Sequence, residues 1–140
     1  MSRPVTTERF AQGMTFPEYL AQMRTNQERF ATRLAETEIN PDDRAAMRGH
    51  TLKILVITED WCGDALVGFP GLAKLVEGAP DVEMRVFLRD GNPDVMDQYL
   101  KRGLYRTIPV FVFFDEQMNE LARFMERQDV VTELRTVLKV

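Results

Sequence analysis

The sequence predicts a three-layer α/β/α fold in which a mixed four-stranded sheet lies between layers of helices. The first observation is a nearly all-apolar, β-branched run at 52–57, which suits a strand buried on both faces. The second is a further strand candidate at 82–88, separated from the first by a stretch of helical periodicity at 65–77. This spacing is typical of a βαβ unit, with parallel strands and a right-handed crossover.

Length and composition agree with one globular domain and exclude several functional classes. The chain has 140 residues, 44% hydrophobic and 29% charged, which is enough to bury a core without disulfides or metals. The formal charge of −4 and the scattered Lys and Arg exclude the basic surface of a nucleic-acid binder. No apolar run approaches the roughly 18 residues of a membrane span. Since the N-terminus also lacks the apolar segment of a secretory signal, we expect a cytoplasmic protein.

The first third of the chain is predicted to be helical. Thr15 can cap a helix whose first turn holds Pro17 and Glu18. A second, short helix begins at Asn40-Pro41 and ends at Gly49. We expect residues 1–49 to form a helical extension that packs on a core formed by 50–140. The apolar stripe of the first helix consists of Leu20, Met23, Phe30 and Leu34.

The rest of the sheet is predicted from the segments after 88. A helix at 93–100 leads to a third strand at 110–114, which we expect beside 52–58 and parallel to it. The polar turn 115–119 then joins the third strand to an antiparallel edge strand near 120–126. An amphipathic helix capped by Asp129 ends the chain. The strand at 52–58 is therefore predicted to be central.

Cys62 is the candidate functional residue, because the chain has one cysteine and one histidine. These counts exclude an internal disulfide, a Cys₄ zinc site and a His-rich metal site, so no metal and no bound cofactor are expected. Cys62 falls where the strand at 52–58 gives way to a helix, and the free N–H groups and dipole of a helix N-terminus stabilise a thiolate. Gly63 allows a partner to approach the sulfur, and Trp61 offers a flat apolar wall.

Three motifs in order give the chain a resemblance to the thioredoxin superfamily over residues 52–140. They are Trp61-Cys62-Gly63 at the start of the helix, Pro70 eight residues on, and Ile108-Pro109 before the third strand. The resemblance implies that Cys62 is the attacking cysteine and that the Ile108–Pro109 bond is cis and packs beside it. It also implies that the backbone of Thr107 and Ile108 pairs with an extended substrate.

In its departures from the family pattern the chain resembles a monothiol subgroup of thioredoxin-like proteins with a single cysteine. Ala65 stands where the resolving cysteine would be, and Asp64 where thioredoxins have proline. Val56 replaces a buried aspartate of the family. Because a dithiol site releases its product with the second sulfur, a mixed disulfide on Cys62 must here be resolved by an outside thiol. Asp64 is either an acid that acts beside the sulfur or simply a first-turn helix residue.

The sequence therefore predicts a monothiol redox protein that exchanges thiol and disulfide through Cys62. Its partners would be mixed disulfides of proteins or of small thiols, with a low-molecular-weight thiol as co-substrate. Arg89 and Arg106 are expected at the same sheet edge, where they either grip a substrate carboxylate or stay solvated. The alternatives are a structural cysteine, a non-catalytic binding module, and a redox sensor that forms a disulfide between two chains.

Overall fold

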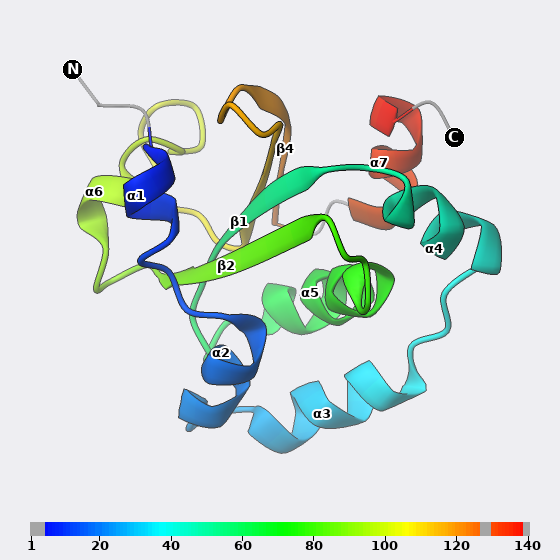
Figure 1. The fold of residues 1–140 in the computed structure, drawn as a ribbon. Coiled ribbons are helices and arrows are strands. Elements are labelled where there is room, and N and C mark those ends of the chain that lie inside the picture. Colours follow the sequence, from blue (N-terminus) through cyan, green and yellow to red (C-terminus); the bar gives the residue numbers. More distant parts are fainter. Residues whose placement is uncertain (1–4, 127–129, 139–140) are drawn as a thin grey trace.

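The computed structural model describes residues 5–126 and 130–138 (Figure 1). Four helices precede the first strand, and a helix follows each of the first two strands. None of the helices described is long and apolar enough to cross a membrane. In chain order the elements are α1 (Thr7–Phe10), α2 (Phe16–Gln22), α3 (Gln27–Glu36), α4 (Pro41–Arg48), β1 (Leu52–Thr58), α5 (Gly63–Val76), β2 (Val82–Leu88), α6 (Pro93–Met96), β3 (Val110–Phe114), β4 (Glu120–Met125) and α7 (Val130–Leu138).

The strand order is β2-β1-β3-β4, with β1 in the interior of the sheet and β4 at an edge, as predicted. Strands β1 and β2 are parallel, with Thr58 opposite Leu88. The prediction that 110–114 runs parallel to β1 was wrong, because β3 is antiparallel to it and Val56 lies opposite Phe111. The predicted helix at 93–100 is also shorter and spans Pro93–Met96. A parallel strand needs a crossover that returns to the other end of the sheet, whereas this connection stays at the end where β2 finishes.

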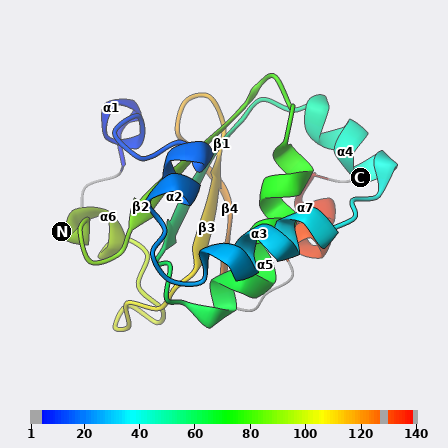
Figure 2. The ribbon, with the colours of Figure 1, turned by 90° about the horizontal axis from the view of Figure 1, so that it is seen from below.

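The sheet separates two apolar clusters, because successive side chains of a strand point to opposite faces. On one face, Ile54 and Val56 of β1 pack with α2, α3, α5 and α7 (Figure 2). On the other face, Leu55 and Ile57 pack with residues of α1 and α6 and with Cys62. The central strands β1 and β3 are buried almost throughout. The sheet is therefore enclosed between two helical layers.

The N-terminal helices pack on the sheet and on α5. The predicted cap at Thr15 is present as a capping box with Glu18. The single stripe predicted over 20–34 is divided between α2 and α3, because Asn26 takes a left-handed backbone conformation with φ of 63°. Met23 and Phe30 are buried, and helix α3 lies along α5 (Figure 2).

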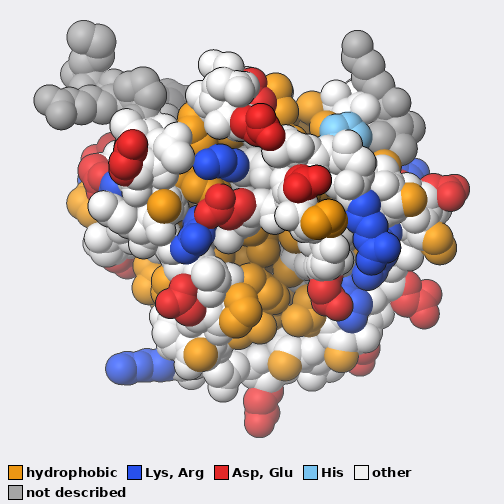
Figure 3. Space-filling view, in the orientation of Figure 1, with side chains coloured by type: hydrophobic (Ala, Val, Ile, Leu, Met, Phe, Trp, Pro, Cys, Tyr) orange, Lys and Arg blue, Asp and Glu red, His pale blue; other side chains and the backbone are white. Residues whose placement is uncertain are grey.

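The segment between α1 and α2 runs along the outer edge of the sheet. Met14 and Val86 of β2 exchange two backbone hydrogen bonds of 2.8 Å. Gly13 lies so close to β2 that a Cβ at this position would come within 2.6 Å of the Phe87 ring. A hollow with exposed apolar side chains lies further along this edge, between α2, α5 and β2 (Figure 3). It is lined by the beginning of β2, so it lies away from Cys62.

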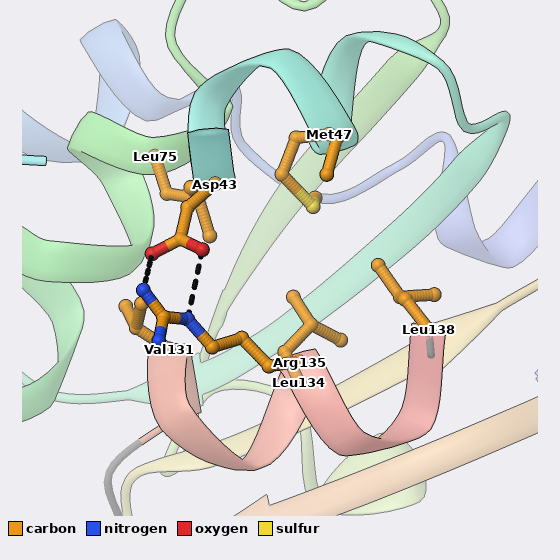
Figure 4. A pocket seen from close by; sticks show the side chains of 8 residues that line it. Asp43, Met47, Leu75, Val131, Leu134, Arg135 and Leu138 are labelled. Carbon is orange, nitrogen blue, oxygen red and sulfur yellow. Dashed lines mark hydrogen bonds and ion pairs between the residues drawn. The ribbon is translucent and has the colours of Figure 1, made fainter. Parts of the chain in front are cut away.

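Helices α4 and α7 meet near the C-terminal end of α5. The carboxylate of Asp43 accepts two hydrogen bonds from the Arg135 guanidinium, of 2.8 and 2.6 Å (Figure 4). Beside this ion pair lies a small pocket that Asp43 and Arg135 line together with Met47, Leu75 and apolar residues of α7. The predicted cap of α7, Asp129, lies outside the described residues.

Candidate functional site

Cys62 is the N-cap residue of α5, at the place predicted from the sequence. Strand β1 ends at Thr58, and the chain turns so that the Cys62 N–H donates to the Glu59 carbonyl at 3.2 Å. The sulfur makes no capping hydrogen bond with the N–H groups in the first turn of α5. The dipole of this 14-residue helix therefore influences the sulfur only through its electrostatic field. Cys62 is only 8% exposed.

The sulfur lies against the segment that leads into β3. The Cys62 thiol faces the Ile108 carbonyl oxygen at 3.7 Å, and the Ile108–Pro109 peptide bond is cis. The predicted cis bond is confirmed, and the sulfur contacts the carbonyl of the residue before Pro109, 46 positions along the chain. They meet because β3 begins at the sheet edge where β1 ends, which requires the antiparallel pairing of these strands. The antiparallel direction of β3 thus brings Cys62 and the segment before Pro109 to the same place.

The backbone before Pro109 has free donors near the sulfur. Within residues 5–126 and 130–138, no hydrogen bond uses the N–H of Thr107 or Ile108. At the next residue, a Cβ at Gly63 would meet nothing within 4 Å, so the start of α5 is not crowded there. The backbone before Pro109 thus has donors left for pairing with another chain.

Trp61 and Arg89 form an exposed stack beside Cys62. The indole is 48% exposed, and the guanidinium carbon of Arg89 lies 4.8 Å from its ring centroid, a cation–π distance. Arg89 also donates to the carboxylate of Asp90 at 2.9 Å and to the Arg106 carbonyl at 3.3 Å. The stack connects the end of β2 to the loop before β3.

Arg106 reaches the same edge, as predicted, and is also already paired. Its guanidinium makes two hydrogen bonds with Asp97, of 2.8 and 3.0 Å. A substrate carboxylate would have to displace Asp97 from Arg106 or Asp90 from Arg89. Exposed ion pairs contribute at most about 1 kcal/mol, so such an exchange is not costly.

The acidic residues of the loop 58–62 are held by backbone donors from other segments. Asp60 accepts hydrogen bonds from the N–H groups of Arg24 and Thr25, at 2.8 and 3.1 Å. Glu59 accepts one from the Asp90 N–H at 2.9 Å. Asp64 lies in the first turn of α5, where an acid is favourable to the helix. The carboxylates of Glu59 and Asp60 thus anchor the loop as well as adding negative charge near Cys62.

Tyr19 is a residue of this region that the sequence analysis missed. It is completely buried, and its hydroxyl is a buried side-chain polar atom without a hydrogen-bond partner in the described part of the chain. Burial raises the pKa of Tyr19 well above its usual value, and the Thr58 hydroxyl, a polar neighbour, opposes this rise. The charges of Glu59, Asp60 and Cys62 raise the pKa of this phenol further. In the sequence, Tyr19 is merely the neighbour of Leu20 in an apolar stripe.

No group of three or more His, Cys, Asp or Glu side chains that could hold a metal ion occurs among the residues described. The reactive group of the site described above is the Cys62 thiol. A thiol at a helix N-terminus, with free backbone donors beside it, has the chemistry to attack a disulfide of an extended partner that reaches the sulfur.

Comparisons with known proteins give the same fold. A family model described as Thioredoxin matches residues 13–139. A crystal structure of PA1234, a protein of unknown function from Pseudomonas aeruginosa, is similar with a TM-score of 0.72 and 23% identity, covering 93% of this chain and 82% of that one. An HIV epitope-scaffold is similar with a TM-score of 0.73 and 22% identity, covering 93% and 86%. No curated protein matches the chain.

The two structural likenesses establish the fold alone, while the family match reaches further. It begins at Gly13, so it includes α2 to α4 as well as the sheet and the Trp61-Cys62-Gly63 segment. Sheet order, position of the thiol and family match agree, and the chain therefore belongs to the thioredoxin family, with a single cysteine.

Proposed function

We propose that this protein is a monothiol thiol–disulfide exchange protein that reacts through Cys62. The observation that carries the proposal is the position of the sulfur, at the N-terminus of α5 and 3.7 Å from the Ile108 carbonyl. A thiolate formed there is favoured by the helix dipole, and it faces the open edge of the sheet. No bound cofactor enters the reaction.

The reaction balances with one thiol as co-substrate. The Cys62 thiolate attacks one sulfur of a disulfide, forms a mixed disulfide and releases the other sulfur as a thiolate, which takes up a proton. Ala65 supplies no second sulfur, so an external thiolate attacks the partner's sulfur and releases Cys62 as a thiolate. The net change is that the external thiol replaces the first leaving thiol in the disulfide.

The surroundings of Cys62 support mixed disulfides of proteins or of small peptide-like thiols as substrates. The N–H groups of Thr107 and Ile108 can pair with an extended backbone, and Trp61 can cover its apolar part. Arg89 and Arg106 would bind a carboxylate by exchanging their present partners, Asp90 and Asp97. A compartment with abundant reduced thiol, such as the cytoplasm, would supply the co-substrate.

A non-catalytic binding module is the second candidate, and the burial of Cys62 favours it. The residue is only 8% exposed and packs in an apolar cluster with Ala65 and Ile108. A small buried thiol of this kind often serves only for packing. In that case the exposed surface at Trp61 would hold a partner segment without covalent chemistry.

The two candidates are separated by turnover of a protein mixed disulfide in the presence of a small thiol. We expect the wild-type chain to accelerate release of the bound thiol, and Cys62→Ser to show only the uncatalysed rate. The matched control is Ala65→Ser, which adds a hydroxyl near the sulfur but keeps the thiol. A wild-type chain that binds the substrate but is no faster than Cys62→Ser would establish the binding module.

Ala65→Cys tests the geometry of the site. Positions 62 and 65 are one helical turn apart, and Ala65 is 3% exposed, so a thiol at 65 would be shielded as a resolving thiol must be. We expect a reversible 62–65 disulfide. The reduced variant should reduce a substrate disulfide in a single turnover without an added small thiol, ending with the 62–65 disulfide, which a reductant must reduce before the next turnover. Failure to form this disulfide under mild oxidation would contradict the inferred reactivity of Cys62.

A further inference from the structure

Strand β2 forms one edge of the sheet, and only part of that edge is covered. Alternate residues of an edge strand direct their N–H and C=O groups away from the sheet. Val86 is one of these residues, since it exchanges two backbone hydrogen bonds with Met14. Leu88 is another, since its carbonyl accepts a hydrogen bond from the Asn92 side chain at 2.9 Å. The even-numbered residues of β2 thus form its outer edge.

Met84 belongs to this outer edge and has no strand beside it. The pairing of β2 with β1 is continuous over the whole of β2, so the alternation of outward and inward residues is not interrupted. The odd-numbered residues face β1, and just beyond the strand the Arg89 N–H still donates to the Thr58 carbonyl. Within the described part of the chain, no other segment bonds to the N–H or C=O of Met84. An added strand could therefore form with Met84 the two hydrogen bonds that Met14 forms with Val86.

The uncovered edge at Met84 borders the hollow between α2, α5 and β2 (Figure 3). The Met14 segment leaves the edge at Thr15, where the capping box turns the chain into α2. Besides Met84, the hollow is lined by Phe16 of α2 and Val76 of α5. These three side chains are only partly buried, although they pack on the apolar cluster of that sheet face. A strand added at Met84 would direct every second side chain towards these apolar groups.

The surroundings of the uncovered edge are acidic. A second hollow adjoins the first and shares Val82 and Glu83 with it. The Arg85 guanidinium already bonds to Glu83 at 3.0 Å and to the Gly13 carbonyl at 3.1 Å. A segment with lysine or arginine among its apolar residues complements this charge, whereas a second copy of the same acidic edge does not. The charged residues that line the two hollows are four acids and two bases, namely Glu77, Asp81, Glu83, Glu116, Lys53 and Arg85.

We propose that the uncovered part of the β2 edge binds an extended, basic segment of a partner protein, which adds to the sheet as a further strand. Main-chain hydrogen bonds with Met84 hold the segment, its alternate apolar side chains enter the hollow, and its basic side chains meet the acids of both hollows. The site lies at the beginning of β2, whereas Cys62 follows the end of the parallel strand β1. Binding therefore leaves the thiol uncovered and does not depend on the proposed function.

The probe is a capped peptide of alternating valine and threonine residues with a lysine at each end, added to the full chain. We expect hydrogen exchange at the Met84 amide, followed by NMR, to become about tenfold slower when the peptide is bound. A matched peptide with glutamate in place of each lysine should bind about fivefold more weakly, and the difference should shrink in high salt. Two peptides that bind equally well, or that leave the Met84 amide unchanged, would overturn the proposal.

Met84→Pro and Met84→Ala separate the backbone from the side chain. Both variants lose the methionine side chain, but only proline also removes the N–H, and proline is tolerated on an edge strand where the N–H faces outward. We expect Met84→Pro to bind the lysine peptide about fivefold more weakly than Met84→Ala does. Equal affinities of the two folded variants would contradict the addition of a strand. If Met84→Pro does not fold, the amide exchange of the wild-type chain decides the proposal by itself.

Two further measurements separate this proposal from the alternatives. Cys62→Ser should bind the lysine peptide as tightly as the wild-type chain, because the thiol lies at the other end of the parallel strands. A loss of binding in Cys62→Ser would place the peptide at the thiol site and overturn the proposal. Sedimentation of the chain without peptide tests for pairing of two copies through this edge. A dimer that Met84→Pro abolishes and Met84→Ala retains would assign the edge to a second copy, and would also overturn it.

Discussion

At its N-terminus helix α5 meets Cys62, the loop 58–62 and the segment before β3, whereas at its C-terminus it meets α4 and α7. The first end is built around a thiol, an unpaired hydroxyl and backbone donors without partners. The second is built around a bidentate ion pair between Asp43 and Arg135, which line a small pocket with apolar neighbours (Figure 4). Both ends are fastened by segments distant in sequence. Among the residues that the structure describes, the reactive thiol and the unpaired buried hydroxyl lie at the first end.

The contrast suggests a division of roles along one helix. At the C-terminal end, polar groups are used to close the structure: the Arg44 side chain donates to the Lys74 carbonyl, one of the last carbonyls of α5. At the N-terminal end, the Asp60 carboxylate likewise fastens the α2–α3 connection by accepting the Arg24 N–H. The Cys62 thiol, in contrast, makes no capping hydrogen bond with α5. Stability and chemistry should therefore respond separately to substitutions at the two ends.

Removal of residues 1–49 is expected to have the largest effect on stability, because this region covers both ends of α5. The described part of it buries several large side chains. Truncating one such Phe or Met side chain costs about 2–5 kcal/mol, and a whole domain has about 5–15 kcal/mol of stability. These buried side chains are Phe10, Tyr19, Met23, Phe30 and Met47.

We therefore expect chain 50–140 to lose its cooperative thermal transition, as measured by circular dichroism. A cooperative transition of 50–140 near the wild-type temperature would show that the helical region is an independent arm and not part of the core.

A pair of aspartate substitutions is expected to separate the two ends of α5. Asp60→Ala removes a carboxylate that accepts two backbone hydrogen bonds, and Asp43→Ala removes one that accepts two from Arg135. Hydrogen bonds to charged groups contribute about 1.5–3 kcal/mol to stability. The free energy of unfolding, measured with urea, should therefore fall by about 1–3 kcal/mol in each variant. Only Asp60→Ala should also change the alkylation rate of Cys62.

Each of these variants is the control for the other, because the two lose stability by a similar amount. If Asp43→Ala altered the reactivity of Cys62 as much as Asp60→Ala, the effect would come from general destabilisation. The two ends of the helix would then not be independent.

Much of the fold could be predicted, because it is encoded in local patterns. The capping box of Thr15 and Glu18 and the apolar run of β1 need no distant partner to be recognised. The direction of β3 could not be predicted in this way, since an apolar run reads the same in both directions. It depends on the short helix α6, whose end no local signal marked. The break at Asn26 depends on a contact with Asp60, 34 positions away.

The candidate site divides in the same way. Cys62, Trp61 and Pro109 were predicted because they belong to short motifs next to strand ends. The pairing of Arg106 with Asp97 and the buried hydroxyl of Tyr19 were not, because they depend on how side chains from separate elements meet. A tyrosine in an apolar helical stripe looks like any core residue until its hydroxyl is found without a partner.

Asp94→Asn is expected to have the smallest effect, because it touches neither end of α5. The Asp94 carboxylate joins α6 to Arg9 of α1 with hydrogen bonds of 2.9 and 3.0 Å, at the protein surface. These hydrogen bonds lower the pKa of Asp94 below its ordinary value of 3.8. Since the pKa is lower in the folded state, the pair contributes stability above the ordinary pKa and loses it as the pH falls through the lowered one.

We therefore expect Asp94→Asn to lower the free energy of unfolding at pH 7 by less than about 1 kcal/mol, as is usual for exposed ion pairs. The difference from wild type should shrink when the pH is lowered until Asp94 is protonated, and also when salt screens the pair. Cys62 alkylation should stay at the wild-type rate. Salt screens an exposed ion pair far more than a buried one. If the free energy of unfolding fell by well over about 1 kcal/mol and the loss persisted in high salt, the Arg9–Asp94 pair would hold α1 as firmly as the Asp43–Arg135 pair holds α4.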